Sequence, residues 1–106
     1  MLIPSFGAEM LGLERVETTF YNDFSIAERF GIEAIKDTFN RAFNEWKNDV
    51  KYFTELVMVL NHKTWNFYDT DRDLAYVYNT LWKEANSYGL NHFKGDDLRF
   101  YINVLD

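Results

Sequence analysis

The sequence predicts an all-α protein, a compact antiparallel bundle of three long helices with a short helix at each end. Two observations support this prediction. No glycine or proline occurs between Ile32 and Tyr88, so a long block of chain lacks the residues that interrupt helices. Within that block, apolar residues recur at spacings of three and four, which is the period of a helix with a buried face.

The bundle is predicted to be organised around the segment from Lys51 to Tyr68. This segment contains an unbroken apolar run, Leu56-Val57-Met58-Val59-Leu60, which fits a buried strand or a helix, and the lack of flanking turn residues favours a helix. With 100° between successive residues, one broad face gathers Tyr52, Phe53, Leu56, Val57, Val59, Leu60, Thr64, Phe67 and Tyr68. The opposite side gathers Lys51, Thr54, Glu55, Asn61 and His62.

Two large apolar residues, Met58 and Trp65, fall on the polar side of this predicted helix. They either make a second packing contact inside the chain or form an exposed patch for self-association or for a partner. The Trp65 side chain is large, so it is expected to contribute substantially to packing in the first case and to binding in the second. Together with His62, these residues form the interaction surface that the sequence predicts.

Residues 1–24 are predicted to form an ordered amino-terminal arm with one short helix at Ala8–Glu14. The arm carries too many apolar residues for a free tail, so it is expected to pack on its own subunit or to be exchanged with a second one. After it, Ser25-Ile26-Ala27-Glu28 fits a capping box. A short helix is therefore expected at Ile26–Phe30, ending at Gly31.

A narrow apolar stripe predicts an outer helix at Ile32–Asn48, with one covered face. Asp49 is expected to cap the central helix that follows. The third long helix is expected at Arg72–His92, with Thr70 or Asp71 as its cap.

Gly89 is expected to bend or end this third helix, and Lys94-Gly95 marks a turn. Asp96 or Asp97 is expected to cap a final short helix. Helical spacing continues there through four apolar residues: Leu98, Tyr101, Ile102 and Leu105. A strand over residues 99–105 is the alternative.

The composition predicts a single helical domain spanning residues 1–106. Apolar residues make up 47% of the chain and aromatic residues 19%, which suffices for a core and argues against disorder. No apolar run approaches the roughly 20 residues of a membrane span. The amino terminus lacks the basic region and cleavage site of a signal peptide, so the expected localisation is cytoplasmic and no membrane partner is expected.

Residues for catalysis or metal binding do not form a recognisable pattern, so the sequence predicts no enzyme, no cofactor and no metal site. Cysteine is absent, and His62 and His92 lack the spacing of a helix-borne metal pair. Asp69-x-Asp71-x-Asp73 begins like a calcium loop. A calcium loop requires glycine at its sixth position and a carboxylate at its twelfth, and these positions are Leu74 and Thr80.

The segment from Ile26 to Ile32 resembles the first helix and turn of helix-turn-helix DNA-binding proteins. The resemblance ends there, because the motif requires an apolar residue where this chain has Asp37. The net charge of −6 also disfavours contact with a phosphate backbone, so nucleic acid is an improbable partner.

A longer resemblance covers roughly Phe20 to the carboxyl terminus. It is carried by the runs Asp23-Phe24-x-Ile26-Ala27-Glu28-x-Phe30-Gly31-x-x-Ala34-Ile35-x-Asp37-Thr38, Arg41-Ala42-Phe43-x-Glu45-Trp46-Lys47 and Thr54-Glu55-Leu56-Val57-Met58-Val59-Leu60-Asn61. In these residues the chain resembles a family of small uncharacterised bacterial proteins found among genes of phages and integrative mobile elements. The resemblance implies no catalytic residues. It implies an accessory protein that acts by binding other proteins.

The leading functional hypothesis is a small, non-enzymatic protein-interaction module of mobile-element type, with a homodimer as one form. The alternative is an acidic inhibitor that occupies the nucleic-acid site of a host defence protein, which requires carboxylates gathered on one face. The second alternative is a degenerate helix-turn-helix protein that binds DNA. The partner protein itself is not identified by the sequence.

Overall fold

The structure is a computed structural model that describes residues 13–105, with side chains from residue 19 onward. Five helices are present in this range: α2 (Leu13–Glu28), α3 (Ile32–Trp46), α4 (Val50–Phe67), α5 (Arg72–His92) and α6 (Gly95–Leu105). The range contains no strand, so the predicted all-α class is confirmed and the strand at the carboxyl end is wrong. No helix in residues 13–105 is long and apolar enough to cross a membrane.

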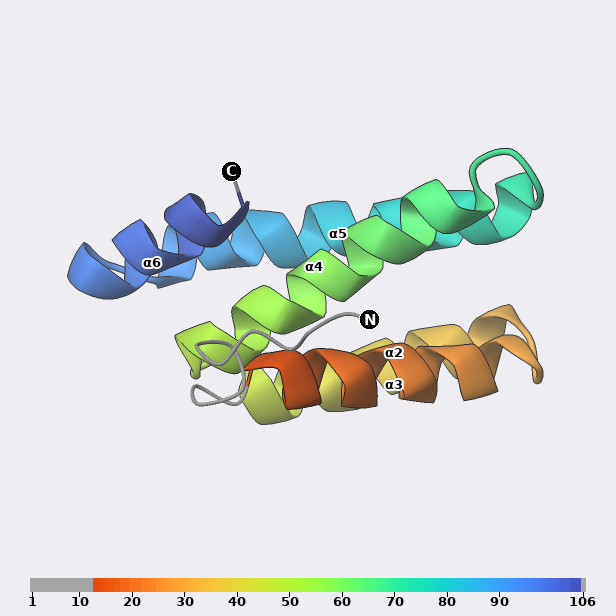
Figure 1. The fold of residues 1–106 in the computed structure, drawn as a ribbon, viewed down its shortest axis with the longest axis horizontal. Coiled ribbons are helices and arrows are strands. Elements are labelled where there is room, and N and C mark those ends of the chain that lie inside the picture. The colour runs from red at the N-terminus through yellow and green to blue at the C-terminus, as the bar shows by residue number, and fades with distance from the viewer. Residues whose placement is uncertain (1–12, 106) are drawn as a thin grey trace.

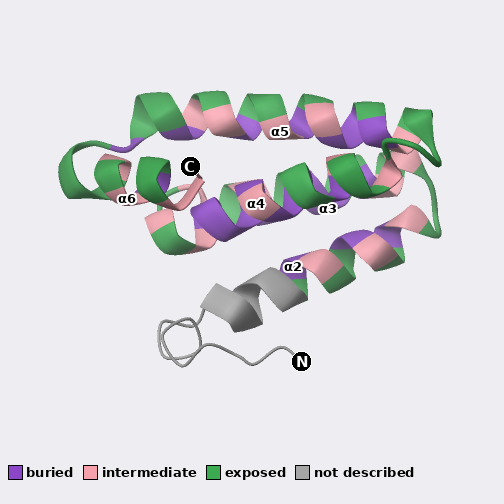
Figure 2. Cartoon of the chain, turned by 45° about the horizontal axis from the view of Figure 1, so that its top comes forward, coloured by how far each residue is buried: buried purple, intermediate pink, exposed green. Residues whose placement is uncertain are grey.

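The central position of α4 is confirmed. Figure 1 shows α4 running between a layer of α2 and α3 and a layer of α5 and α6. It packs against all four of these helices. Buried residues accordingly appear on several sides of α4, whereas the outer helices are buried along one side (Figure 2).

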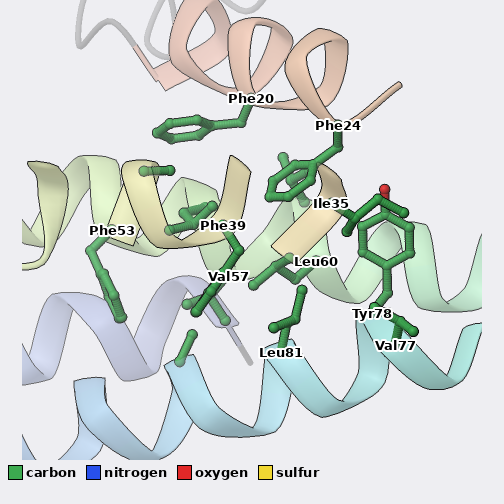
Figure 3. Packing of buried hydrophobic residues seen from close by; sticks show 14 of the residues in the cluster. Phe20, Phe24, Ile35, Phe39, Phe53, Val57, Leu60, Val77, Tyr78 and Leu81 are labelled. Atoms are coloured by element: carbon green, nitrogen blue, oxygen red, sulfur yellow. The ribbon is translucent and has the colours of Figure 1, made fainter. Parts of the chain in front are cut away.

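The apolar run of α4 forms the middle of the core, because Leu56, Val57, Val59 and Leu60 are all fully buried. Figure 3 shows their packing partners from three directions. These partners are Phe20 and Phe24 from α2, Ile35 and Phe39 from α3, and Val77, Tyr78 and Leu81 from α5. A central helix buried on several sides explains why its apolar face is so broad.

Two predicted helix caps are confirmed. The Asp49 carboxylate accepts a hydrogen bond from the Tyr52 backbone N–H at 3.3 Å, at the start of α4. The Asp71 carboxylate accepts one from the Leu74 N–H at 3.1 Å, at the start of α5. Each cap satisfies one of the free N–H groups of a helix start, which is worth about 1 kcal/mol.

The prediction for the amino-terminal part is wrong between residues 13 and 30. Residues 13–24 are helical, and α2 continues through Ser25 to Glu28 without the break that a capping box needs. The Ser25 hydroxyl instead accepts a hydrogen bond from the Lys63 ammonium. The arm residues 1–12, and with them most of the predicted helix Ala8–Glu14, lie outside the described residues.

Several smaller predictions also need correction. Asp96 and Asp97 lie inside the first turn of α6 and do not precede it. Thr54 and Glu55 are buried, although they fall on the predicted polar side of α4, because α4 has neighbours on that side as well. Gly89 does not end α5, which continues to His92 as the spacing predicted.

Gly89 has a packing role instead, since it lets α6 approach α5 closely. A Cβ atom added at this position would lie 2.7 Å from Cζ of Tyr101, well inside van der Waals contact. The Tyr101 ring has little room to move. It is fully buried beside Phe53 and Phe93, and its hydroxyl donates a hydrogen bond to Asn86 Oδ1 at 2.8 Å.

Gly89→Ala is therefore expected to destabilise the protein by about 1–3 kcal/mol, the usual cost of overpacking a core. Alanine is the better helix former by about 1 kcal/mol, so helix propensity alone predicts the opposite sign. Chemical denaturation followed by circular dichroism measures the change. In the Tyr101→Phe background the ring remains, so Gly89→Ala is expected to stay destabilising. In the Tyr101→Ala background the ring is absent, so Gly89→Ala is expected to cost no stability. A Gly89→Ala variant more stable than wild type would contradict the packing role of Gly89.

Candidate interaction surface

The candidate interaction surface results from a difference in length between α5 and α6. Helices α4 and α5 pack side by side, and α6 folds back against both. Helix α5 has 21 residues and is about 31 Å long, whereas α6 has 11 residues and is about 16 Å long. Because α6 follows α5 after a short turn, it covers only the part of the α4–α5 junction near the end of α5 (Figure 1).

A groove opens where α6 no longer covers this junction, and we call it the seam groove. Its volume is about 670 Å³. Its described walls come from three helices: Met58, Asn61, His62 and Trp65 of α4, Trp82, Asn86 and Leu90 of α5, and Tyr101, Ile102, Val104 and Leu105 of α6. Apolar and aromatic side chains dominate these walls, with two amides and one imidazole among them.

The three residues predicted from the sequence, Met58, His62 and Trp65, all line the seam groove. Trp65 is 65% exposed, His62 is exposed and Met58 is half-buried. The His62 ring also packs edge-on against the Tyr21 ring of α2, with centroids 5.4 Å apart. The structure thus brings the three residues together on one surface, and their part in binding stays a prediction.

The exposed aromatic side chains continue beyond the groove along α4 and α5. We define the aromatic ridge as Trp65, Tyr68 and Tyr76. The Trp65 and Tyr68 rings lie 5.4 Å apart, and Tyr76 is 72% exposed. Beside the ridge lies a second hollow of about 270 Å³, which Trp65 also lines. The Arg72 guanidinium lies 4.8 Å from the Tyr68 ring centre and covers part of that ring.

No carboxylate lines either of these two hollows among the described residues. The acids of the described chain lie elsewhere, many of them at the two ends of the molecule (Figure 1). One end carries Asp49, Asp96 and Asp97, at the starts of α4 and α6. The other carries Asp69 and Asp71, between α4 and α5, and Asp73, in the first turn of α5. A further hollow between α2 and α3 does contain acids, Asp23 and Asp37.

A second notable feature is a buried polar network under α2. The Lys63 side chain is only 2% exposed. Its ammonium donates to Ser25 Oγ at 2.8 Å, forms an ion pair with Glu28 Oε2 at 2.9 Å, and lies 3.9 Å from the centre of the Tyr21 ring. The Tyr78 hydroxyl donates to the same Glu28 oxygen at 2.6 Å. The network joins α2 to α4 and α5.

The network links three helices, and its ammonium group is shielded from solvent. All the contacts of the Lys63 ammonium point into the protein, and Lys63 does not line the seam groove. Burial and the negative charge of Glu28 both raise the pKa of the Tyr78 hydroxyl, so this group stays neutral and remains a donor. Burial likewise raises the pKa of Tyr101.

The buried position of Lys63 was not predicted from the sequence, although a signal for it was present. Lys63 follows Val59 by four residues and Leu60 by three, and it precedes Phe67 by four. This helical spacing places Lys63 in the buried stripe of α4. The α5 and α6 walls of the groove were also missed, because their residues were assigned only to packing stripes. Among residues 13–105 no group of three or more histidines and acids is placed to hold a metal ion.

The fold and this surface together define a small all-α bundle with an open apolar face. Comparisons with protein-family models, with curated proteins and with solved structures found no match for the chain.

Proposed function

We propose that this protein acts by protein–protein contact, and that the seam groove and the aromatic ridge form its binding surface. The observation that carries the proposal is the concentration of exposed large apolar side chains on one face without carboxylates. Five of the seven exposed large apolar side chains among the described residues line the seam groove or the second hollow: Trp65, Tyr68, Tyr76, Leu90 and Ile102. Large contiguous apolar patches of this kind typically mark sites of protein or ligand contact.

The open shape of the face favours a protein partner over a small molecule. Small-molecule sites are concave and bury about 70–90% of their ligand. Here Trp65 is 65% exposed, and Leu90 and Ile102 on the opposite walls are exposed as well. A groove between helices with apolar walls instead suits the apolar side of a helix or another shaped protein surface.

The role as an inhibitor at a nucleic-acid site draws no support from the charge distribution. That role requires phosphate-like carboxylates on one face, whereas the described acids are spread over both ends of the molecule and the α2–α3 hollow, among basic residues such as Arg72 and Arg99. Some are also paired, as Asp96 is with Arg99 at 2.8 Å. The mobile-element setting is proposed from the resemblance in sequence alone, which implies an accessory protein that binds other proteins.

Peptide selection tests the proposal directly. Peptides from a displayed library that bind the wild-type protein are expected to be amphipathic helices, and each is then measured against two variants. Trp65→Ala is expected to weaken binding by at least about 30-fold, since a central tryptophan often contributes 2 kcal/mol or more. Phe30→Ala is the matched control, because Phe30 is an aromatic residue that is 78% exposed on the far α2–α3 side.

Two results would contradict the proposal. One is a set of selected peptides that bind wild type and Trp65→Ala with equal affinity. The other is a loss of binding in Phe30→Ala alone, which would place the binding surface beside the α2–α3 hollow that contains Asp23 and Asp37.

A further inference from the structure

We infer that the partner of this surface is a second copy of the same chain, related by a two-fold axis that passes near Trp65. This inference rests on the proposed function, since it names the occupant of the same face. Three properties of the face support it: its shape, its charge and its area.

The shape is complementary to itself. Trp65 stands between the seam groove and the second hollow and lines both of them. In a two-fold dimer both copies use the same patch. If a residue of one copy contacts a site on the other, the same residue of the second copy contacts the same site on the first. A projecting ring beside a hollow meets this requirement, because Trp65 of each copy enters the seam groove of the other.

The charge also favours a second copy at this face. Each chain carries a net charge of −6, so two copies repel each other at most orientations. Among the described residues lining the two hollows, Arg72 is the only one with a formal charge, and its guanidinium stacks on Tyr68. The α2–α3 hollow is less suitable, since it carries three charged residues, Asp23, Asp37 and Arg41, which two apposed copies would have to pair or bury.

The exposed area of the face is a large part of what a dimer needs. A stable interface buries about 800 Å² on each partner. Aromatic side chains bury about 150–250 Å² each, and the three ridge rings are 45–72% exposed, so the ridge alone offers on the order of 400 Å². The groove walls, with Leu90 and Ile102 exposed, add further apolar surface next to the ridge.

Sedimentation equilibrium of the full chain tests this inference, from low micromolar to near-millimolar concentration. Wild type is expected to show a reversible monomer–dimer equilibrium. Trp65→Ala is expected to raise the dissociation constant by about 1,000-fold, because each dimer loses two central rings. Ile102→Asp, which adds a carboxylate to the groove wall, is expected to remain monomeric, and Phe30→Ala is expected to behave as wild type. Circular dichroism confirms that every variant is folded.

The outcomes separate this inference from the proposed function. A wild-type protein that stays monomeric throughout overturns the second copy as partner, while peptide binding lost in Trp65→Ala still supports the face as a binding surface. A dimer that persists in Trp65→Ala and Ile102→Asp overturns the inference as well, and it places the dimer contact elsewhere. A dimer weakened by both substitutions but not by Phe30→Ala supports it.

Discussion

Glu28→Ala is expected to lower the free energy of unfolding by about 3–5 kcal/mol, the usual cost of removing one partner from a buried ion pair. The reason is the environment of Lys63, whose ammonium is buried and has Glu28 as its counter-charge at 2.9 Å. The substitution also removes the acceptor of the Tyr78 hydroxyl, which is buried with it. Urea denaturation, measured at a concentration where the monomer prevails, gives the value.

Glu33→Ala is the matched control for this prediction. Glu33 also forms an ion pair, with Lys36 at 3.7 Å, but its side chain is 87% exposed. Exposed pairs of this kind contribute about 0–1 kcal/mol, so a small change is expected. Equal effects of Glu28→Ala and Glu33→Ala would show that the ion pair of Glu28 with Lys63 contributes no more to the free energy of unfolding than an exposed ion pair.

A double substitution separates the burial of the charge from the loss of contacts. Glu28→Gln retains an oxygen acceptor for the Tyr78 hydroxyl, and Lys63→Met removes the buried ammonium but keeps an unbranched side chain that is one atom shorter. Buried ion pairs replaced by uncharged groups of similar size often cost little. The double variant Glu28→Gln/Lys63→Met is therefore expected to be more stable than Glu28→Ala, and a double variant at least as unstable would contradict the role of the buried charge.

Phe53→Ala is expected to destabilise the protein by a similar amount, about 3–5 kcal/mol. The Phe53 side chain is fully buried at the point where α3, α4, α5 and α6 meet. Its ring centroid lies 5.6 Å from that of Tyr88, 5.6 Å from that of Phe93 and 6.1 Å from that of Tyr101. Truncation leaves a cavity among rings that have little freedom to close it, so the docking of α6 weakens as well.

Trp65→Ala, at low protein concentration, is the control for this core prediction. Both residues belong to α4, and tryptophan is the larger of the two. Because Trp65 is 65% exposed, its truncation is expected to change the stability of the monomer by only about 0.5 kcal/mol. A Trp65→Ala monomer that is as unstable as Phe53→Ala would make Trp65 a core residue and remove the basis for the binding surface.

The helices that the sequence predicts well are those with strong local signals. Helix α4 starts at the capping Asp49 and α5 at the capping Asp71, and both then follow an apolar period that continues for many residues. These signals involve residues within one or two turns of each other, so they are visible in a single sequence.

The error at Ser25 shows what local signals miss. Ser25 and Glu28 have the spacing of a capping box, but both side chains are held by Lys63, which lies 38 residues from Ser25. A contact so distant in sequence has no local signature. The spacing of Phe20, Phe24 and Ala27, all buried, was the competing signal for a continuous helix, and it outweighs the cap.

The candidate surface could be predicted only in part for the same reason. Met58 and Trp65 lie on the polar side of a helix, which marks them as unusual from the sequence alone. Whether a neighbouring helix covers them depends on the length and direction of α6, and these are tertiary properties. Trp82 and Ile102 looked like ordinary packing residues, because a helical period does not distinguish a covered stripe from the wall of a groove.

A dilution series of amide nuclear magnetic resonance spectra tests self-association through this face directly. We expect concentration-dependent shifts confined to the seam groove and the aromatic ridge, around Met58–Tyr68, Tyr76 and Trp82–Leu90, with part of α6. Residues around Phe30 are expected to keep constant shifts. Spectra that do not change with concentration would contradict self-association, and changes centred on the α2–α3 hollow would place the contact on the opposite side of the molecule.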